Sequence, residues 1–311
     1  MVFYAVEMVS VYLCVFLAVA FFTLLERKAL ASFHLRKGPN KVGFGGIPQP
    51  LADALKLFTK ELPIPRVGLS WLFYVCPGLA LLVMMLLWWM YPVFYCLSMG
   101  QMSILFFICV SSMNAYVLMF AGWSSNSKYA GLGAVRAFAQ SISYEVSMSL
   151  ILLFAVVLHG SFNLFSIQKS GQYMWYGLIW WPVTISWLVS CLAETNRTPF
   201  DFVEAESELV SGYNVEYGGG GFASLFIAEY GSIMFISFLT VSVFFSNYWP
   251  CFHFWAGLVL FFKAMVICYW FIWVRASFPR LRYDMLMELM WKSILPGCLA
   301  SWMALVLYSV L

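Results

Sequence analysis

Hydrophobic and polar positions alternate in long blocks along this chain of 311 residues. Each apolar block has about 20 residues, the length that an α-helix needs to cross the hydrocarbon core of a bilayer. Eight such blocks occur, at residues 2–25, 69–91, 102–121, 143–161, 174–193, 222–246, 253–273 and 289–310. The pattern predicts an all-α polytopic membrane protein with about eight transmembrane helices.

A shorter segment, residues 50–62, has a different pattern. Leu51, Leu55, Phe58 and Leu62 recur at helical spacing, and the charged residues lie on the other faces. This predicts an amphipathic helix that lies along the membrane surface. The helix could serve as an anchor alone, or it could form, with the first transmembrane helix, an opening through which a lipid-soluble ligand enters from the bilayer.

The amino-acid composition indicates a membrane protein and argues against several classes of enzyme. The chain is 63% hydrophobic and 20% aromatic, which is outside the range of soluble proteins, so we expect a single integral membrane domain over residues 1–311. The first apolar block lacks a basic region before it and a small-residue cleavage signal, so we expect a transmembrane helix and no removable signal. The eight cysteines and three histidines are scattered without metal-ligand spacing. No nucleotide-binding glycine motif or nucleophile elbow occurs, so we expect no catalytic residue and no metal site.

The basic residues predict the orientation. Fourteen of the seventeen Lys and Arg residues lie in the first, third, fifth and seventh loops. Cytoplasmic or equivalent loops carry such an excess of bases, so these loops are expected on the inner side and both termini on the outer side. The inner-side loops are residues 26–68, 122–142, 194–221 and 274–288. The second of these ranges begins with the polar run Ser124-Ser125-Asn126-Ser127-Lys128 and is then expected to become helical.

The fifth loop is unusually acidic. Residues 193–221 contain six of the fourteen acids of the chain and one base, Arg197. The acids are Glu194, Asp201, Glu204, Glu206, Glu208 and Glu216. A solvated acidic run is the ordinary interpretation. Apolar residues interleave with these acids, however, and this favours a loop folded into protein, where crowded carboxylates raise one another's pKa and exchange protons near neutrality.

The fourth, sixth, seventh and eighth predicted transmembrane helices are each interrupted by an ionisable residue: Glu145, Glu229, Lys263 and Lys292. A charge inside the hydrocarbon region is costly unless it is paired, solvated or neutralised, and such residues commonly mark proton or ion routes. Glu145, Glu229 and Lys263 are therefore candidates for a proton path. Structural pairing is the alternative.

Several ordered motifs occur at characteristic intervals: Glu26-Arg27-Lys28, residues 35–40 (LRKGPN), 53–58 (DALKLF), 143–145 (SYE), 193–201 (AETNRTPFD), 206–209 (ESEL) and 282–284 (RYD). Together they resemble the membrane subunit 1 family of proton-pumping NADH:ubiquinone oxidoreductase, respiratory complex I. The resemblance runs through nearly the whole chain.

The resemblance implies a core subunit that forms much of the ubiquinone access channel and an acidic path coupling quinone reduction to proton translocation. Ubiquinone would be the substrate, while flavin mononucleotide and iron–sulfur clusters would belong to partner subunits. The implied path residues are Glu145, Glu194, Asp201, Glu204, Glu206, Glu208 and Glu229, to which the intramembrane charge adds Lys263. The implied channel residues are Arg27, Arg36, Asp53 and Phe226.

The implied partners are the hydrophilic subunits of the quinone site, the antiporter-like membrane subunits and membrane lipids, with no nucleic acid. We expect the mitochondrial inner membrane, with the odd-numbered loops in the matrix, and a bacterial cytoplasmic membrane is the alternative. Two other functions stay open at this point. One is the homologous membrane subunit of an ion-translocating hydrogenase-type complex, and the other is a structural membrane anchor or independent ion carrier.

Overall fold

The computed structural model describes residues 2–63, 65, 68–91, 101–171, 174–203, 211–246 and 253–310. Over these residues the chain is helical and contains no strand. Seven of the described helices are long and apolar enough to cross a membrane, which confirms the prediction of an all-α polytopic membrane protein. They are α1 (Val2–Phe33), α3 (Ser70–Trp89), α4 (Ser103–Ser124), α5 (Lys128–His159), α10 (Gly219–Phe244), α11 (His253–Ser277) and the run from α12 (Tyr283–Glu288) to α13 (Leu295–Val310).

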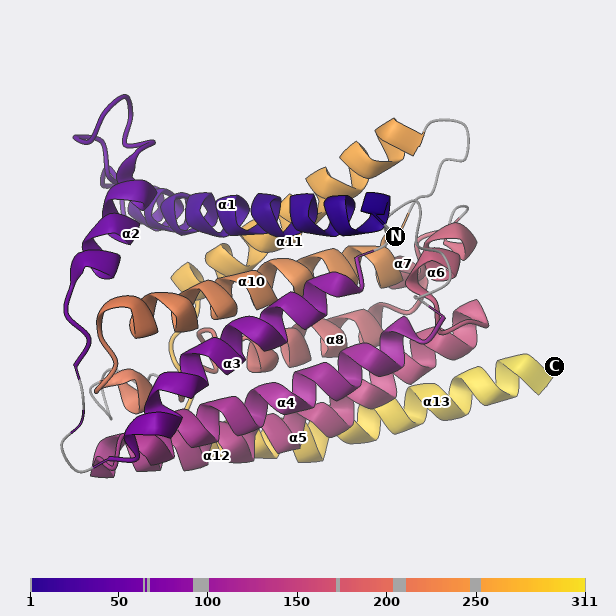
Figure 1. Ribbon diagram of the computed structural model, residues 1–311. Helices are drawn as coiled ribbons and strands as arrows, with labels where there is room; N and C mark the ends of the chain where they lie inside the picture. The colour runs from indigo at the N-terminus through magenta and orange to yellow at the C-terminus, as the bar shows by residue number, and fades with distance from the viewer. Residues whose placement is uncertain are drawn as a thin grey trace.

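The long helices lie side by side with similar axis directions (Figure 1). In this view α1 lies along one edge, α4, α5 and α13 lie along the other, and α3 and α10 run between them. The short helix α2 (Gln49–Thr59) lies at one end of the bundle, here named the α2 end. The N- and C-termini lie at the opposite end, together with α6 (Leu164–Ser170) and α7 (Tyr176–Ile179).

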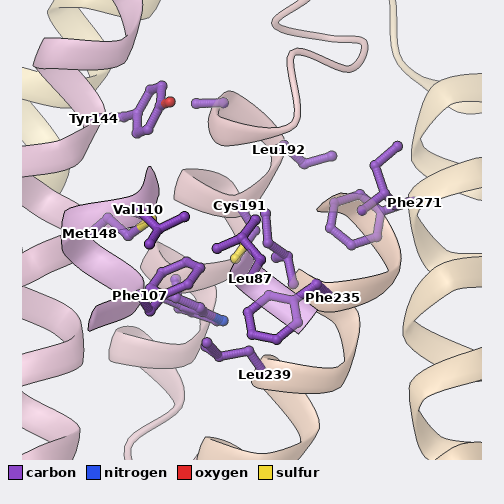
Figure 2. Close-up of a cluster of buried hydrophobic side chains, with 14 of the residues drawn as sticks. Leu87, Phe107, Val110, Tyr144, Met148, Cys191, Leu192, Phe235, Leu239 and Phe271 are labelled. Atoms are coloured by element: carbon purple, nitrogen blue, oxygen red, sulfur yellow. The ribbon is translucent and has the colours of Figure 1, made fainter. Parts of the chain in front are cut away.

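The core is built where α3, α4, α5, α8 (Trp181–Glu194) and α10 meet (Figure 2). Phe107 of α4 stacks on Phe235 of α10 with ring centroids 5.9 Å apart. The α3–α10 contact is close at Gly231, where a Cβ atom would lie 2.6 Å from the Met84 side chain. The Trp88 indole N–H donates to the Gly231 carbonyl at 3.1 Å. Small residues therefore set the helix spacing, as is usual where helices pack within a membrane.

The fifth predicted transmembrane helix, residues 174–193, is not one continuous helix. The chain forms α7, a turn at Trp180, and then α8, whose 14 residues span only about 21 Å. Pro182 lies in the first turn of α8. Because proline lacks an N–H and its ring clashes with the carbonyl four residues earlier, it can begin a helix but cannot continue one. The apolar block hid this break.

Other boundaries also differ from the predictions. Helix α1 continues to Phe33, beyond its apolar block and into the first predicted loop. Helix α5 begins at Lys128, which confirms that the third loop becomes helical after its polar run and shows that this helix continues into the apolar block. Helix α2 ends at Thr59, three residues before the predicted end, and Lys60 is extended ahead of Pro63. Residues 289–294 form a π-helical turn between α12 and α13. Lys292 lies in this turn, where its ammonium bonds the Glu288 carboxylate at 2.7 Å and both side chains are exposed.

The α4–α5 contact generates a prediction. A Cβ atom on Gly122 would lie 2.4 Å from the Ala134 Cβ and 2.7 Å from the Ala130 carbonyl oxygen. Gly122→Ala should therefore push the two helices apart and lower the free energy of unfolding by about 1–3 kcal/mol. Gly131→Ala is the matched control, because nothing lies within 4 Å of its added methyl group. The measurement is the thermal midpoint of the protein in detergent, and equal midpoints for the two variants would contradict the prediction.

Candidate functional site

A cluster of opposite charges joins three distant segments at the α2 end. The Glu26 carboxylate of α1 accepts hydrogen bonds through Oε1 from Arg197, at 3.0 Å, and from Arg275 at the end of α11. The Glu26 side chain is only 5% exposed. A buried carboxylate requires such partners, since an uncompensated charge would cost several kcal/mol. We refer to Glu26, Arg197 and Arg275 as the arginine cluster.

The turn after α8 places Arg197 in this cluster. Asn196 has a positive φ of 49°, and the Arg197 N–H donates back to the Leu192 carbonyl at 3.3 Å. Asparagine tolerates this left-handed conformation better than most residues, and the backward hydrogen bond closes the helix end. The sequence Glu194-Thr195-Asn196-Arg197 thus ends α8 and turns the arginine toward α1 and α10.

Arg197 also lies over the ring of Tyr230, with the guanidinium 4.5 Å from the ring centroid. Burial of the guanidinium opposes its charge, but the Glu26 carboxylate outweighs that effect, with additional help from Tyr230 and Glu229. The pKa of Arg197 is therefore held above its usual value. Arg197 is a fixed positive charge that links Glu26 of the arginine cluster electrostatically to Glu229.

Glu229 of α10 faces the short helix η1 (Gly212–Asn214). The Tyr213 hydroxyl donates to Glu229 Oε1 at 2.6 Å. Helix η1 reaches this position because it packs directly on α5, where a Cβ atom on Gly133 would lie 3.1 Å from the Gly212 and Tyr213 backbone. The close approach of η1 to α5 therefore orients the hydroxyl that binds Glu229.

An internal cavity of about 30 Å³ connects the acids of α8 and α10. Its polar lining includes Glu194, Asn196, Tyr213 and Glu229, and Ser111 and Asn114 of α4 contribute further polar groups. A polar cavity of this size can hold about one or two water molecules. We refer to it as the acid cavity.

Glu194 is the last residue of α8 and is buried, with a relative exposure of 5%. Its Oε2 atom makes no hydrogen bond to any described residue. Its electrostatic neighbours are the Tyr144 hydroxyl and the Glu145 carboxylate, both on α5. Glu145 Oε1 is likewise buried without a hydrogen bond to a described residue, although the residue as a whole is partly exposed. Within the described residues, neither Glu194 nor Glu145 forms an ion pair with a basic side chain.

Asp201 is held differently. The Arg280 guanidinium donates to Asp201 Oδ2 at 3.0 Å, and the Leu281 N–H donates to the Pro199 carbonyl at 3.1 Å. On the other side of this segment, the Gln140 amide of α5 donates to the carbonyls of Ala193 and Phe200, at 3.0 and 3.1 Å. These contacts fix residues 193–202 between α5 and the segment before α12.

The predicted channel residues divide into two groups. Arg27 and Asp53 form an ion pair of 2.6 Å that connects α1 to α2, and Gln49 also donates to Asp53 at 2.9 Å. Phe226 lies in an aromatic row along α10, 4.3 Å from Phe222 and 6.3 Å from Tyr230 between ring centroids. The row leads from the level of α2 toward the arginine cluster, because α2 packs against both α1 and α10. Arg36 is exposed in the loop after α1 and does not join this group.

Lys263 lies apart from the acids. Its ammonium donates to the Phe245 carbonyl at 2.9 Å and lies 4.7 Å from the Trp175 ring centroid, at the end of α10 far from Glu229. A cation at a helix C-terminus satisfies an unpaired carbonyl and complements the helix dipole. Glu204, Glu206 and Glu208 lie outside the described residues. Their predicted part in the path therefore stays a prediction.

Sequence reasoning missed several partners of these acids. Tyr213, Tyr144, Gln140, Arg275 and Arg280 each contact a segment remote in sequence. Periodicity identifies neighbours along one helix only, so no local signal pairs Arg275 with Glu26, which lies 249 residues earlier. Only the presence of polar residues such as Tyr144 and Gln140 close to an acidic motif could have suggested such contacts.

The arginine cluster yields a test of stability. Glu26→Gln leaves Arg197 and Arg275 without their carboxylate, and breaking a buried pair in this way should cost about 3 kcal/mol or more. We expect a lower thermal midpoint and less assembled protein. Glu288→Gln, which breaks the exposed pair with Lys292, is the control and should change neither. Indistinguishable behaviour of the two variants would show that the arginine cluster does not hold these segments together.

Known proteins match the chain along most of its length. The family model described as NADH dehydrogenase matches residues 6–306. The NADH-ubiquinone oxidoreductase chain 1 of Heterololigo bleekeri is 55% identical over 94% of this chain and 93% of that protein. The proteins of the same name from Aedes aegypti and Paracentrotus lividus are 50% and 45% identical. They cover 91% and 98% of this chain, and 89% and 96% of their own lengths.

These matches confirm the resemblance found in the motifs. Identities of 45–55% over nearly the full length exceed what a shared fold alone would require. The chain belongs to the NADH dehydrogenase family, whose matching members are NADH-ubiquinone oxidoreductase chain 1 proteins.

Proposed function

We propose that this chain is a core membrane subunit of a proton-pumping NADH:ubiquinone oxidoreductase, in which it forms much of the ubiquinone access channel and an acidic path coupling quinone reduction to proton translocation. The observation that carries the proposal is the acid cavity. Two carboxylates from different helices, Glu194 and Glu229, line one small cavity whose remaining wall is more than half apolar, in a chain that is largely apolar. Protein interiors exclude such an arrangement unless protons or water occupy it.

The acids of the path would respond in sequence. Glu229 accepts a short hydrogen bond from Tyr213 and is attracted by the fixed charge of Arg197. A charge that arrives near Arg197 would therefore change the protonation equilibrium of Glu229. Water in the acid cavity would carry a proton between Glu229 and Glu194. Glu194 lies next to Glu145, which is partly exposed on α5. The path would therefore lead from the arginine cluster to the surface of the chain.

The position of Glu145 also supports a membrane partner. Its neighbours on α5, Ile142 and Val146, are 47% and 40% exposed, so Glu145 borders an apolar outward face. A carboxylate at this depth is costly beside lipid, and a neighbouring protein subunit that supplies polar groups removes the cost. Antiporter-like membrane subunits are the partners proposed for this face.

The quinone would approach from the other side of α10. Helix α2 exposes Leu51, Leu55 and Phe58, each at least 61%, while its ion pair to Arg27 fixes it beside α1. This combination suits a surface helix that borders an opening to the bilayer. The aromatic row from Phe222 to Tyr230 would then guide a planar apolar ligand toward Arg197.

Electrons would reach the quinone from partner subunits, which would hold the flavin mononucleotide and iron–sulfur clusters. Among the described residues, no group of three or more His, Cys, Asp or Glu side chains could hold a metal ion. This chain would act by responding to charge. Reduction of the quinone near Arg197 would change the local electric field in a poorly screened region, and the carboxylates would change their protonation to compensate.

We place the chain in the mitochondrial inner membrane, with the α2 end in the matrix.

The acid cavity gives the central functional test. Glu194→Gln in the assembled complex removes a proton acceptor but keeps the side-chain shape, so quinone reduction and proton pumping should fall by about tenfold or more. Oxidation of NADH by an artificial acceptor should be unchanged, which shows that assembly is normal. Glu216→Gln is the matched control, because Glu216 lies in the same loop and does not line the acid cavity. Unchanged quinone reductase and pumping rates in Glu194→Gln would refute the proposed path.

The channel is tested separately. Asp53→Asn removes the charge partner of Arg27 and loosens α2, so the KM for a short-chain quinone should rise about twofold to fivefold, as expected for a partly exposed ion pair. The kcat should change little, since Asp53 does not line the acid cavity. Lys56→Gln, a change of an exposed residue in the same helix, is the control.

If the purified complex carries no quinone and reduces none, the hydrogenase-type alternative is favoured.

A further inference from the structure

A groove between α1 and α11 has no part in the proposed channel or acid path. Its walls are formed by Phe21, Leu24, Leu25 and Ala29 of α1, with Tyr269 of α11 opposite. Its volume is about 450 Å³, within the range of ligand sites. Lys28 and Ser32 lie at the end of the groove nearest the α2 end. The groove is thus apolar along its length and polar at one end.

Further exposed apolar residues follow on both helices beyond the groove lining. Leu17 and Phe21 are 57% and 48% exposed on the same stripe of α1 as Lys28, at spacings of three and four residues. On α11, Phe262 and Val266 are 65% and 67% exposed at the same spacing from Tyr269. The helical rise from Leu17 to Lys28 is about 17 Å, close to half the ~30 Å thickness of a bilayer core. The apolar track therefore matches the depth of one leaflet.

The polar end carries a cation that is not paired with a described acid. The Lys28 ammonium donates to the Gly45 carbonyl at 2.5 Å, which fixes its position and leaves two N–H groups. The nearest acid in sequence, Glu26, is occupied by Arg197 and Arg275, and Asp53 is occupied by Arg27. The surrounding loop, residues 26–68, contains eight Lys and Arg residues and three acids. Its positive potential favours an anionic headgroup.

We propose that the α1–α11 groove binds an anionic phospholipid, with the phosphate at Lys28 and Ser32 and one acyl chain against Phe21, Leu25 and Tyr269. Charge complementarity selects this occupant over a neutral quinone, whose headgroup gains little from an ammonium. The rise of about 17 Å from Leu17 to Lys28 matches the acyl-chain length of a lipid that lies in one leaflet. The bound lipid would cover the α1–α11 contact beside the arginine cluster.

The test uses the assembled complex after removal of bound lipid. Phosphatidylglycerol or phosphatidylcholine, each with a photoreactive acyl chain, is added in detergent micelles, and the labelled peptides are identified by mass spectrometry. We expect phosphatidylglycerol to label residues 17–32 and 262–273 more strongly than phosphatidylcholine does. Lys28→Gln should lower labelling by phosphatidylglycerol about fivefold. It should lower labelling by phosphatidylcholine less, because the choline cation already offsets the charge of that phosphate. Leu25→Trp, which fills the groove, should lower labelling by both.

Lys37→Gln is the matched control, since Lys37 is exposed in the same loop outside the groove, and it should change neither label. If Lys28→Gln fails to assemble, Ser32→Asp replaces it, because Ser32 is exposed and an added carboxylate there should repel the phosphate. Equal labelling by the two lipids, insensitivity to both charge variants, or displacement of the label by ubiquinone would overturn the proposal.

Discussion

The contact of Glu26 with Arg197 and Arg275 is the interaction on which the rest of the charged end depends. It joins α1, the turn after α8 and the end of α11, three segments that share no local sequence relation. Because Glu26 is buried, loss of both arginines would leave its carboxylate uncompensated, and loss of Glu26 would leave both guanidinium groups without their anion. Arg197 in turn lies over Tyr230 and near Glu229, so the position of the acid cavity relative to α1 and α2 follows from this cluster.

Five of the described acids occupy two kinds of environment. Glu26, Asp53 and Asp201 each face a guanidinium within 3.0 Å or less, and they hold segments together. Glu194 and Glu145 face a tyrosine hydroxyl and each other. A carboxylate with a fixed cation keeps its charge during turnover, whereas the state of one without a cation depends on water and nearby charge. Glu194 and Glu145 are therefore suited to change protonation when a nearby charge changes. Glu26, Asp53 and Asp201 are suited to hold the surrounding segments in place.

Much of the fold followed from the apolar blocks. A helix that crosses a bilayer must satisfy its own backbone hydrogen bonds and present apolar side chains to lipid, so its sequence carries a strong signal. The failures have local causes. Pro182 divided the fifth block into α7 and α8, and α1 continued to Phe33 because polar residues can continue a helix once it leaves the membrane. Hydrophobicity reports the depth of a residue more directly than it reports where a helix begins.

The candidate site was predictable only as a set of residues. The sequence alone determined that this is a helical membrane chain with acids concentrated in one loop and two further acids inside its helices, because each of these is a property of composition and spacing. Only the tertiary structure decided which acids face arginines, that Glu194 and Glu229 share a cavity, and that Lys263 caps α10 far from both. The physical reason is that electrostatic environment depends on distances between segments, and those distances arise from helix packing across the whole bundle.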